Sequence, residues 1–416
     1  MFQVPVLQDI FNNMCKVAGN HPDTVSHHSD LPYGTYHHPK FIFLGTNPML
    51  TRNTLTRLEE FGIGERLDEI TFFDIGCNLG HMSIELARRG ARVKAFDCVK
   101  ERLDVLQQLV DYLEYRDRIE LVYLDVQTIE SKEFIKKYGM ADCTICLAVD
   151  GYIADCPRFY DFLSNITNEY CYFESNVKPE ISSLVPEQLQ KTFVHVKSLG
   201  VSKTSSLGRK IYKMDNLSVL VDKTGLGFCD KLVCERKDGT MVKYVSFPFE
   251  KKSGLISRLS GCPYIIPMKI QFNKVIMPYK KTRIILGKFK YVDRFERKTV
   301  YGDFTKEEKI IMKKQFIEAI QYLQKVHICH RDLLVSNILW IPEEQKIQII
   351  DWEFIEEDIV DEMENRYDLK QYDVRYDPTK TFQKNSVFSC YISGLCVYEF
   401  FDKNLCLEDF KQKEIV

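Results

Sequence analysis

Three polar residues set among apolar runs form the most specific chemical pattern in the chain. Asp332 and Asn337 lie five residues apart in a predicted loop, and Asp351 follows a run of isoleucines that predicts a short buried strand. Phosphoryl transfer needs one carboxylate that accepts the proton of the attacking hydroxyl. It also needs an amide and a second carboxylate to hold the metal that bridges the nucleotide phosphates. The pattern therefore predicts Asp332, Asn337 and Asp351 as catalytic residues, with Asn337 and Asp351 as ligands of Mg²⁺.

A second pattern combines two glycines with acids that end predicted strands. Residues 71–75 predict an apolar strand, and Gly76 and Gly80 lie in the turn that follows it. The next two predicted strands finish at Asp97 and Asp125. Open parallel sheets bind ligands at the carboxyl ends of their strands, where one acid can hold both ribose hydroxyls and another can meet an adenine edge. The alternative is that these acids cap the helices of an unliganded sheet.

The glycine turn differs from the fingerprint of dinucleotide-binding proteins. It has the form Asp-x-Gly-x-x-x-Gly instead of Gly-x-Gly-x-x-Gly, which argues against a pyrophosphate cofactor. Residues 71–175 resemble the class I S-adenosylmethionine-dependent methyltransferases, whose first motif has this form. The resemblance implies S-adenosylmethionine as cofactor, bound by Asp74, Gly76, Asn78, Gly80, Asp97 and Asp125.

Three residues are candidates to orient the methyl acceptor. Asp150 and Tyr152 follow the fourth predicted strand, and His81 lies next to Gly80. Polar residues at these places are more often structural, so the structural alternative stays open for each of them. No motif typical of nucleic-acid base methyltransferases occurs in the sequence.

The residues after 216 have the order of the small lobe of a kinase. A glycine turn with Gly225 and Gly227 is followed by a predicted strand that carries Lys243. With Asp351-Trp352-Glu353 where protein kinases have Asp-Phe-Gly, the chain resembles the small-molecule and sugar-kinase branches of the eukaryotic-like kinase superfamily. The resemblance implies that Gly225, Gly227 and Lys243 bind ATP. Glu250 is the one carboxylate between Lys243 and residue 293, so it either pairs with Lys243 from an unusual position or the pair is missing.

The two patterns predict the fold class. Strands that alternate with helices predict an α/β doubly wound, Rossmann-like methyltransferase sheet, followed by an α+β two-lobed kinase-like domain. The expected domains are an N-terminal extension or lid (1–68), the methyltransferase domain (69–216) and the kinase-like domain (217–416, with lobes 217–279 and 280–416). The expected strands of the first sheet are 71–75, 93–96, 119–124, 143–148, 170–173 and 210–213, with helices at 82–89, 99–113 and 181–199.

A methyltransferase followed directly by a kinase resembles the bacterial bifunctional kinase–methyltransferases that cap O-antigen polysaccharides. The resemblance implies that a hydroxyl is phosphorylated and the phosphate then methylated, on a glycan or small molecule. Only 65 residues follow Asp351, so a protein substrate is not expected. One alternative is a methyltransferase whose kinase domain only binds a partner, and a second is a methyltransferase that modifies nucleic acid.

Composition and charge narrow the classes of partner. The apolar content of 45% and net charge of −2 are typical of a soluble globular protein, and the fourteen cysteines without a secretory signal predict a cytoplasmic one. Cys143 and Cys146 lie three apart in a strand, which predicts two core thiols on opposite faces instead of a zinc or redox site. The histidine pairs 27–28 and 37–38 predict a loop over the neighbouring site, with metal binding by the histidines as the alternative. Residues 231–300 contain 17 Lys or Arg against 5 Asp or Glu. This basic segment is either an ordinary solvent-exposed face or a surface that binds an anionic polymer or membrane.

Overall fold

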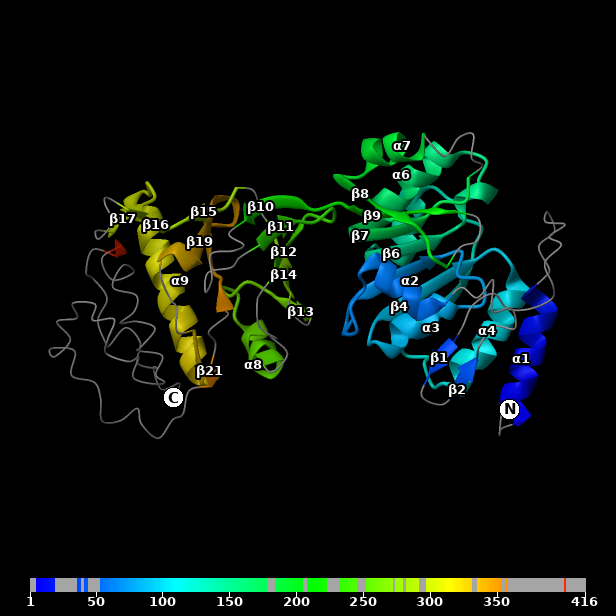
Figure 1. Cartoon of the computed structure of the whole chain (residues 1–416). Helices are drawn as coiled ribbons and strands as arrows, with labels where there is room; N and C mark the ends of the chain where they lie inside the picture. The colour runs from blue at the N-terminus through cyan, green and yellow to red at the C-terminus, as the bar shows by residue number, and fades with distance from the viewer. Residues whose placement is uncertain are drawn as a thin grey trace. The chain divides into compact units, whose positions relative to one another are not determined.

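The computed structural model of the chain forms two compact units, Met1–Lys243 and Tyr244–Val416 (Figure 1). The expected domain boundaries at residues 68 and 216 stay predictions. The structure describes these residues: 5–18, 36–38, 41–43, 53–177, 184–204, 208–222, 232–244, 252–271, 274–279, 282–291, 297–330, 335–352, 356–357 and 400–401.

A seven-stranded sheet organises the first unit. Its order is β5-β4-β3-β6-β7-β9-β8, and its first five strands are parallel, while β9 is antiparallel to both β7 and β8. The strands are β3 (Thr71–Ile75), β4 (Arg92–Asp97), β5 (Ile119–Tyr123), β6 (Ala141–Leu147), β7 (Thr167–Glu174), β8 (His195–Val201) and β9 (Lys210–Asp215). Because the order reverses next to β3, the carboxyl end of β3 is a topological switch point, where such sheets bind ligands. The doubly wound sheet predicted from the sequence is confirmed.

Helices cover both faces of this sheet and enclose two separate cores. One core contains residues of α1 (Pro5–Ala18), α2 (Thr54–Phe61), α3 (His81–Arg88) and α4 (Lys100–Tyr112). The other contains residues of α5 (Ser131–Tyr138), α6 (Cys156–Ile166) and α7 (Val185–Thr192). Cys143 lies in the first core and Cys146 in the second, and neither forms a disulfide, so the prediction of core thiols on opposite faces is confirmed.

Part of the predicted helix 181–199 is wrong. α7 ends at Thr192, and residues 195–201 form strand β8, which pairs with β9. The hydrophobic stretch of α7 is short, with Val185 and Leu189 buried, and the residues that follow it include the β-branched Val194 and Val196, which favour a strand. The antiparallel pairing therefore extends the sheet where periodicity alone suggested more helix.

The first unit also contains strands beyond the seven-stranded sheet. β1 (Tyr36–His38) pairs with β2 (Phe41–Phe43), and β10 (Ser218–Asp222) pairs antiparallel with β11 (Leu232–Glu235). A tight turn closed by the bond from Gly239 N to Arg236 O, 3.0 Å long, leads into β12 (Thr240–Tyr244). The sequence Asp238-Gly239 predicts a hairpin, and the φ of +76° at Gly239 between the neighbouring strands β11 and β12 confirms it.

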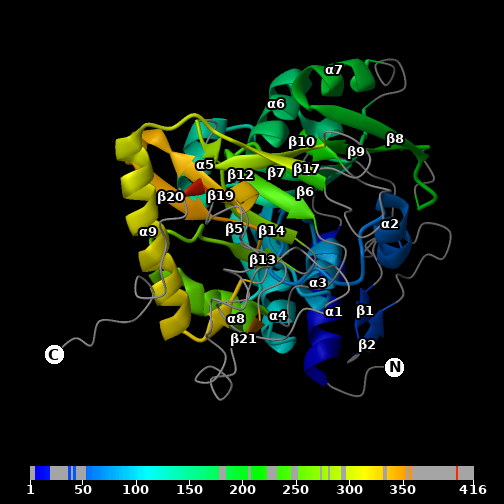
Figure 2. The ribbon, with the colours of Figure 1, turned by 90° about the vertical axis from the view of Figure 1, so that its left-hand side faces the viewer.

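The second unit combines small sheets with one long helix. α8 (Ser253–Arg258) and a 3₁₀ turn (Leu259–Gly261) precede β13 (Lys269–Gln271), which pairs with β14 (Lys274–Pro278). β15 (Ile284–Ile285), β19 (Ile338–Ile341) and β20 (Lys346–Ile349) form a three-stranded sheet. β16 (Gly287–Tyr291) pairs with β17 (Arg297–Tyr301), and β18 (Ile328–Cys329) with β21 (Glu356–Glu357). Figure 2 shows α9 (Lys306–Lys325) running beside β19 and β20.

The sequence from Thr305 to Glu308 predicts a capping box that opens a helix to about residue 325, and α9 begins with this box. The residues predicted to face inward are Ile310, Ile311, Phe316, Ile317, Ile320 and Leu323. Thr305 N donates to Glu308 Oε2 at 2.9 Å, and Glu308 N donates to Thr305 Oγ1 at 3.1 Å. Phe316, Ile320 and Leu323 are buried as expected. Ile310 was expected to face inward but is 62% exposed, because the buried face begins at Met312, two residues or about 200° further around the helix. Within the described residues, no helix combines the length and apolar character needed to cross a bilayer.

Candidate active sites

The glycine turn after β3 is bound to the end of β4. Phe96 O accepts hydrogen bonds from Gly76 N and from the N–H of the next residue, each 2.9 Å long. Gly76 and Gly80 both have a φ of +73°, a backbone conformation that favours glycine. A Cβ added to Gly76 would lie 2.5 Å from a methyl carbon of Val149, and one added to Gly80 equally close to Leu106. Both glycines are therefore required by the tight packing of the turn.

Asp97, at the end of β4, holds the turn from the neighbouring strand. Its Oδ2 accepts a 2.8 Å hydrogen bond from Asn78 N, and its Oδ1 accepts a 2.9 Å bond from Val99 N. A guanidinium nitrogen of Arg102 lies 4.0 Å away, and the residue is 5% exposed. Each carboxylate oxygen has about two lone-pair sites, so both can still accept a hydroxyl of a ligand.

Asp74 lies beneath the same turn and is buried. Its Oδ2 accepts a 2.6 Å hydrogen bond from Ser83 Oγ, which anchors the start of α3 to β3. Burial raises the pKa of Asp74 to about 6, and the negative charge of Asp97 also acts to raise it, against the Ser83 hydrogen bond. At neutral pH the two carboxylates therefore form a negatively charged site that is poorly compensated.

Asp125 completes the series of acids along three adjacent strands. Its Oδ1 accepts a 2.9 Å hydrogen bond from Gln127 N, which forms a turn after β5. Leu124 N donates to Asp97 O at 3.0 Å and joins this strand end to that of β4. Asp74 and Asp97 thus lie among the last two residues of β3 and β4, and Asp125 lies two residues after β5, close to where the sequence predicts them.

The candidates for orienting the methyl acceptor have different environments. Asp150 is 1% exposed, and its Oδ2 accepts hydrogen bonds from Ser175 Oγ at 2.7 Å and from Tyr160 OH at 3.2 Å. Burial raises its pKa above the ordinary range. These bonds join the segment after β6 to the end of β7, which favours the structural alternative for Asp150. Tyr152 is 49% exposed, and His81 is the first residue of α3.

Two features near this edge were not identified from the sequence. Ala148, directly after β6, has a φ of +63°, a strained conformation for alanine, and its N–H donates to Glu174 O at 2.7 Å. Glu174, at the end of β7, is fully buried between the guanidinium groups of Arg57 from α2 and Arg209, the latter at 3.3 Å. The one sequence feature that could have indicated this site is an acid at the end of a predicted strand. The ion pair itself is not visible in the sequence, because Arg57 precedes Glu174 by 117 residues.

In the second unit, the described part of the phosphoryl-transfer motif lies around the end of β20. Ile350 N donates to Asn337 O at 2.9 Å, so the backbones that carry Asn337 and Asp351 are adjacent. The His330 side chain is fully buried, and its Nε2 lies 2.8 Å from Ile350 O, while its ring lies 4.3 Å from the centre of the Trp352 ring. Asp351 has a φ of +68°, the left-handed region. His330 thus contacts both neighbours of Asp351, Ile350 and Trp352.

The remaining predicted residues of the ATP site are only partly described. Lys243 lies on β12 of the first unit and is 7% exposed. Asp332, Gly225, Gly227 and Glu250 lie outside the described residues, as do His27 and His28. Across the ranges that the structure describes, no three His, Cys, Asp or Glu side chains cluster as a metal site. The assignment of Asn337 and Asp351 as Mg²⁺ ligands stays a prediction.

The chain has partial similarity to known proteins, although no protein-family model matches it. It is 33% identical over 90 residues to calcium-dependent protein kinase 5 of Plasmodium falciparum, which covers 21% of this chain and 16% of that protein. It is 26% identical over 198 residues to the protein of the same name from Plasmodium berghei, covering 47% of this chain and 32% of that one. The chain thus spans about a third or less of the curated relatives that it matches.

Solved structures similar to the chain include both enzyme classes that the sequence analysis named. The magnesium protoporphyrin IX methyltransferase of Synechocystis PCC 6803 has a TM-score of 0.33, 18% identity and coverage of 39% of this chain and 77% of that one. The bifunctional kinase-methyltransferase WbdD has a TM-score of 0.31, 18% identity and coverage of 73% and 75%. The predicted fold class stands, with the seven-stranded sheet confirmed by its strand order and followed by an α+β unit.

Proposed function

We propose that the first unit transfers a methyl group from S-adenosylmethionine. The observation that carries this proposal is the bond from Asn78 N to Asp97 Oδ2, which joins the glycine turn to the acid of the neighbouring strand. In this proposal Asp97 would hold the ribose hydroxyls, Asp125 would meet the adenine edge and the glycine turn would contact the rest of the cofactor. The proposal therefore rests on the geometry of the switch point.

The charge of the site fits this cofactor. The charge of Asp97 acts to raise the pKa of Asp74, and the Arg57 guanidinium offsets this repulsion only in part. A ligand that carries a sulfonium and an ammonium group would relieve this repulsion. The cofactor supplies the electrophilic methyl group when bound, while the chain aligns the acceptor with it and excludes water.

Isothermal titration of S-adenosylmethionine against the parent and Asp97→Ala tests the methyltransferase proposal. We expect binding to the parent and at least tenfold weaker binding to the variant. Asp104→Ala is the matched control, because Asp104 is an exposed acid on α4 that pairs with Lys100. Equal affinity for the cofactor in all three proteins would refute the proposed site.

We propose that the second unit, with Lys243, transfers a phosphoryl group from Mg-ATP to a non-protein hydroxyl. The proposal is supported by the backbone contact between Asn337 and Ile350, which brings the two predicted metal ligands together. Asp332 would accept the hydroxyl proton, and Lys243 would hold the α- and β-phosphates, with Glu250 as its partner. We further propose a glycan or small-molecule acceptor whose new phosphate is the group that the first unit methylates.

Phosphotransfer assays on Asp332→Ala and Asp351→Ala test this second activity. Both variants should lose nearly all activity, since one removes the base and the other a metal ligand. Asp303→Ala, an exposed acid before α9, is the control and should retain activity. Parental activity in both site variants would eliminate the kinase proposal.

Two alternatives make different measurable predictions. A kinase-like unit that only binds a partner would show no thermal stabilisation by Mg-ATP, whereas a ligand at 100 times its Kd adds about 2.7 kcal/mol. An enzyme that modifies nucleic acid through residues 231–300 would bind oligonucleotides with strong salt dependence. The same basic segment would bind anionic vesicles if its partner is a membrane surface.

A further inference from the structure

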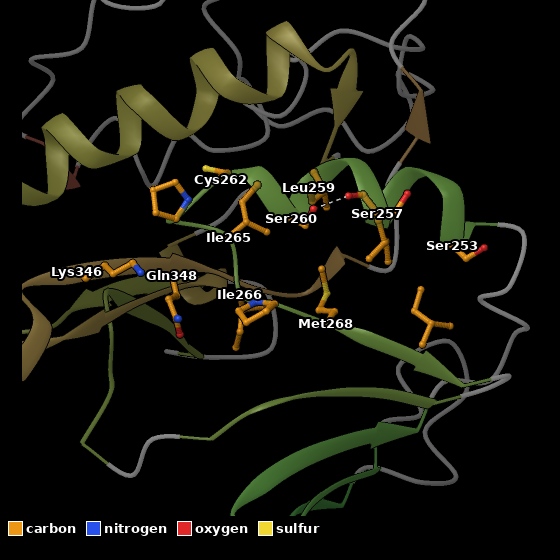
Figure 3. A pocket seen from close by; sticks show the side chains of 14 residues that line it. Ser253, Ser257, Leu259, Ser260, Cys262, Ile265, Ile266, Met268, Lys346 and Gln348 are labelled. Carbon is orange, nitrogen blue, oxygen red and sulfur yellow. Dashed lines mark hydrogen bonds between the residues drawn. The ribbon is translucent and has the colours of Figure 1, made fainter. Parts of the chain in front are cut away.

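The second unit contains a pocket that the proposed reactions do not use. Its volume is about 540 Å³, within the range of about 300 to 1,000 Å³ that is typical of small-molecule pockets. Figure 3 shows its lining side chains between α8 and the strands that face it. The pocket lies wholly within residues 253–348, so it belongs to the second unit alone.

The middle of the pocket is apolar. Ile256, Leu259, Ile265 and Ile266 are each at most 7% exposed, and Met268 and Ile270 complete this wall. Each of them offers only hydrocarbon or thioether surface to the pocket. Such a wall selects the apolar body of a ligand through the area removed from water, at about 25 cal/mol per Å².

The two ends of the pocket are polar. Lys346 and Gln348 from β20 lie at one end, and Ser253 of α8 lies at the other (Figure 3). The lining contains no Asp or Glu, so the Lys346 ammonium is its one formal charge. Within the described residues Lys346 makes no ion pair, which leaves its charge available to a ligand.

We propose that this pocket binds an anionic amphiphile, with its apolar body along Ile256, Ile266 and Met268 and its carboxylate or phosphate at Lys346. The hydroxyl groups of Ser257 and Ser260 donate within the helix, to Gly254 O and Ser257 O, each at 2.8 Å. Because both hydroxyl groups already donate to backbone oxygens, a ligand in the pocket does not have to supply a hydrogen-bond acceptor for them. Charge and shape together favour a chain-like molecule with one negative end over a neutral or cationic one.

The pocket lies beside the strand that leads to Asp351. Ile349 N donates to Tyr264 O at 2.8 Å, and Ile266 N donates to Ile349 O at 3.2 Å. The segment that forms this wall of the pocket is thus hydrogen-bonded to both backbone groups of Ile349, which lies two residues before Asp351. An occupant would stabilise this backbone and with it the predicted Mg²⁺ ligand.

Thermal shift and titration with decanoate, decanol and decylammonium, all below their micellar concentrations, test the proposal. We expect decanoate to stabilise the full chain and to bind about tenfold more tightly than the other two. Lys346→Met should remove this preference while retaining the apolar contacts. Lys314→Met, an exposed lysine of α9 outside the pocket, is the matched control and should behave as the parent.

A pocket-filling variant locates the ligand independently. Ser257→Phe changes an exposed position of α8 and should fold, as its unliganded Tm will report, but it should lose decanoate binding. If the protein sediments with phosphatidylglycerol vesicles and Lys346→Met does not, the natural ligand is a membrane lipid. If the protein does not sediment with the vesicles, the natural ligand is a free amphiphile. Equal binding of the three probes, or decanoate binding unchanged in Lys346→Met, would overturn the proposal. These binding readouts do not depend on either proposed activity.

Discussion

Two pairs of buried acids, at the amino and the carboxyl ends of the parallel strands, differ in the partners that hold them. At the amino edge, where the parallel strands begin, Asp142 accepts hydrogen bonds from Thr71 N at 2.8 Å and from Thr71 Oγ1 at 2.9 Å. Asp142 also contacts the Arg236 guanidinium. The same guanidinium lies 3.4 Å from Glu169. At the carboxyl edge, Asp74 and Asp97 are equally buried, but their hydrogen bonds come from neutral groups.

This difference distinguishes acids that connect secondary-structure elements from acids that are suited to bind a ligand. Buried charges are tolerated when a partner of opposite charge is close, and Arg236 is such a partner for both amino-edge acids. Asp97 has a guanidinium only at 4.0 Å, and Asp74 makes no ion pair among the described residues. A buried acid with a raised pKa and no close cation, such as Asp74, is typical of a functional site. Asp74 and Asp97 are therefore the acids that should respond to a cationic cofactor, whereas Glu174 at the same edge is paired with Arg57 and Arg209.

The largest expected effect is at the amino edge. Asp142→Ala leaves the Arg236 charge buried without its main partner, which should lower the free energy of unfolding by about 3 to 5 kcal/mol. The affinity of the remaining folded protein for S-adenosylmethionine should be unchanged. Urea denaturation measures the first quantity, and titration at low temperature measures the second. Asp238→Ala, whose carboxylate is 27% exposed and 3.6 Å from Arg236, is the milder control.

The next effect is a pH dependence of stability that comes from Asp74. Its pKa is raised to about 6, so between pH 4 and 6 the folded chain binds more protons than the unfolded chain. Stability from this group is therefore greatest at low pH and is lost as pH rises through 6, by about 3 kcal/mol in total. Relative to the parent, Asp74→Asn should gain this amount between pH 4 and pH 8 in denaturation experiments. A constant difference between the two proteins across this range would contradict the assignment.

The sequence predicted the carboxyl edge better than the amino edge. Glycines 76 and 80 and the acids at 74, 97 and 125 belong to a local pattern, because each lies at the end of its own strand or a few residues after it. Asp142 and Arg236 are 94 residues apart, and nothing in either segment marks the contact. Such long-range ion pairs depend on the folded topology, which periodicity does not specify.

Errors in element type had the same physical origin. The strand β8 was predicted as helix, because its partner β9 provides the pairing that its own residues only weakly favour. The helices α1 and α2 were not connected with the sheet, although Leu58 and Phe61 are buried in its core. By contrast, the capping box of α9 is entirely local and was predicted correctly.

A smaller effect should separate the cofactor from its product at Asp97. S-adenosylmethionine carries a sulfonium charge that S-adenosylhomocysteine lacks, so a negative site favours the former. Asp97→Asn keeps one acceptor for the turn but removes the charge, which should weaken S-adenosylmethionine binding by about 10- to 100-fold. The loss for S-adenosylhomocysteine should be smaller. Equal losses for both ligands would mean that Asp97 acts only through hydrogen bonds.

The smallest expected effect is the pH dependence of cofactor binding. If the ionised form of Asp74 favours the cationic cofactor, affinity should be constant above pH 7 and fall by up to about tenfold per unit below pH 6, where the carboxyl group becomes protonated. Titrations of S-adenosylmethionine from pH 5 to pH 8 measure this, and Asp74→Asn should remove the dependence. Because Asp142 is paired with Arg236 at the opposite edge, Asp238→Ala should leave the pH profile unchanged even though it weakens that cluster. A profile that changed with both variants would mean that the two edges are coupled through β3 and β6, and the division between structural and ligand-binding acids would then fail.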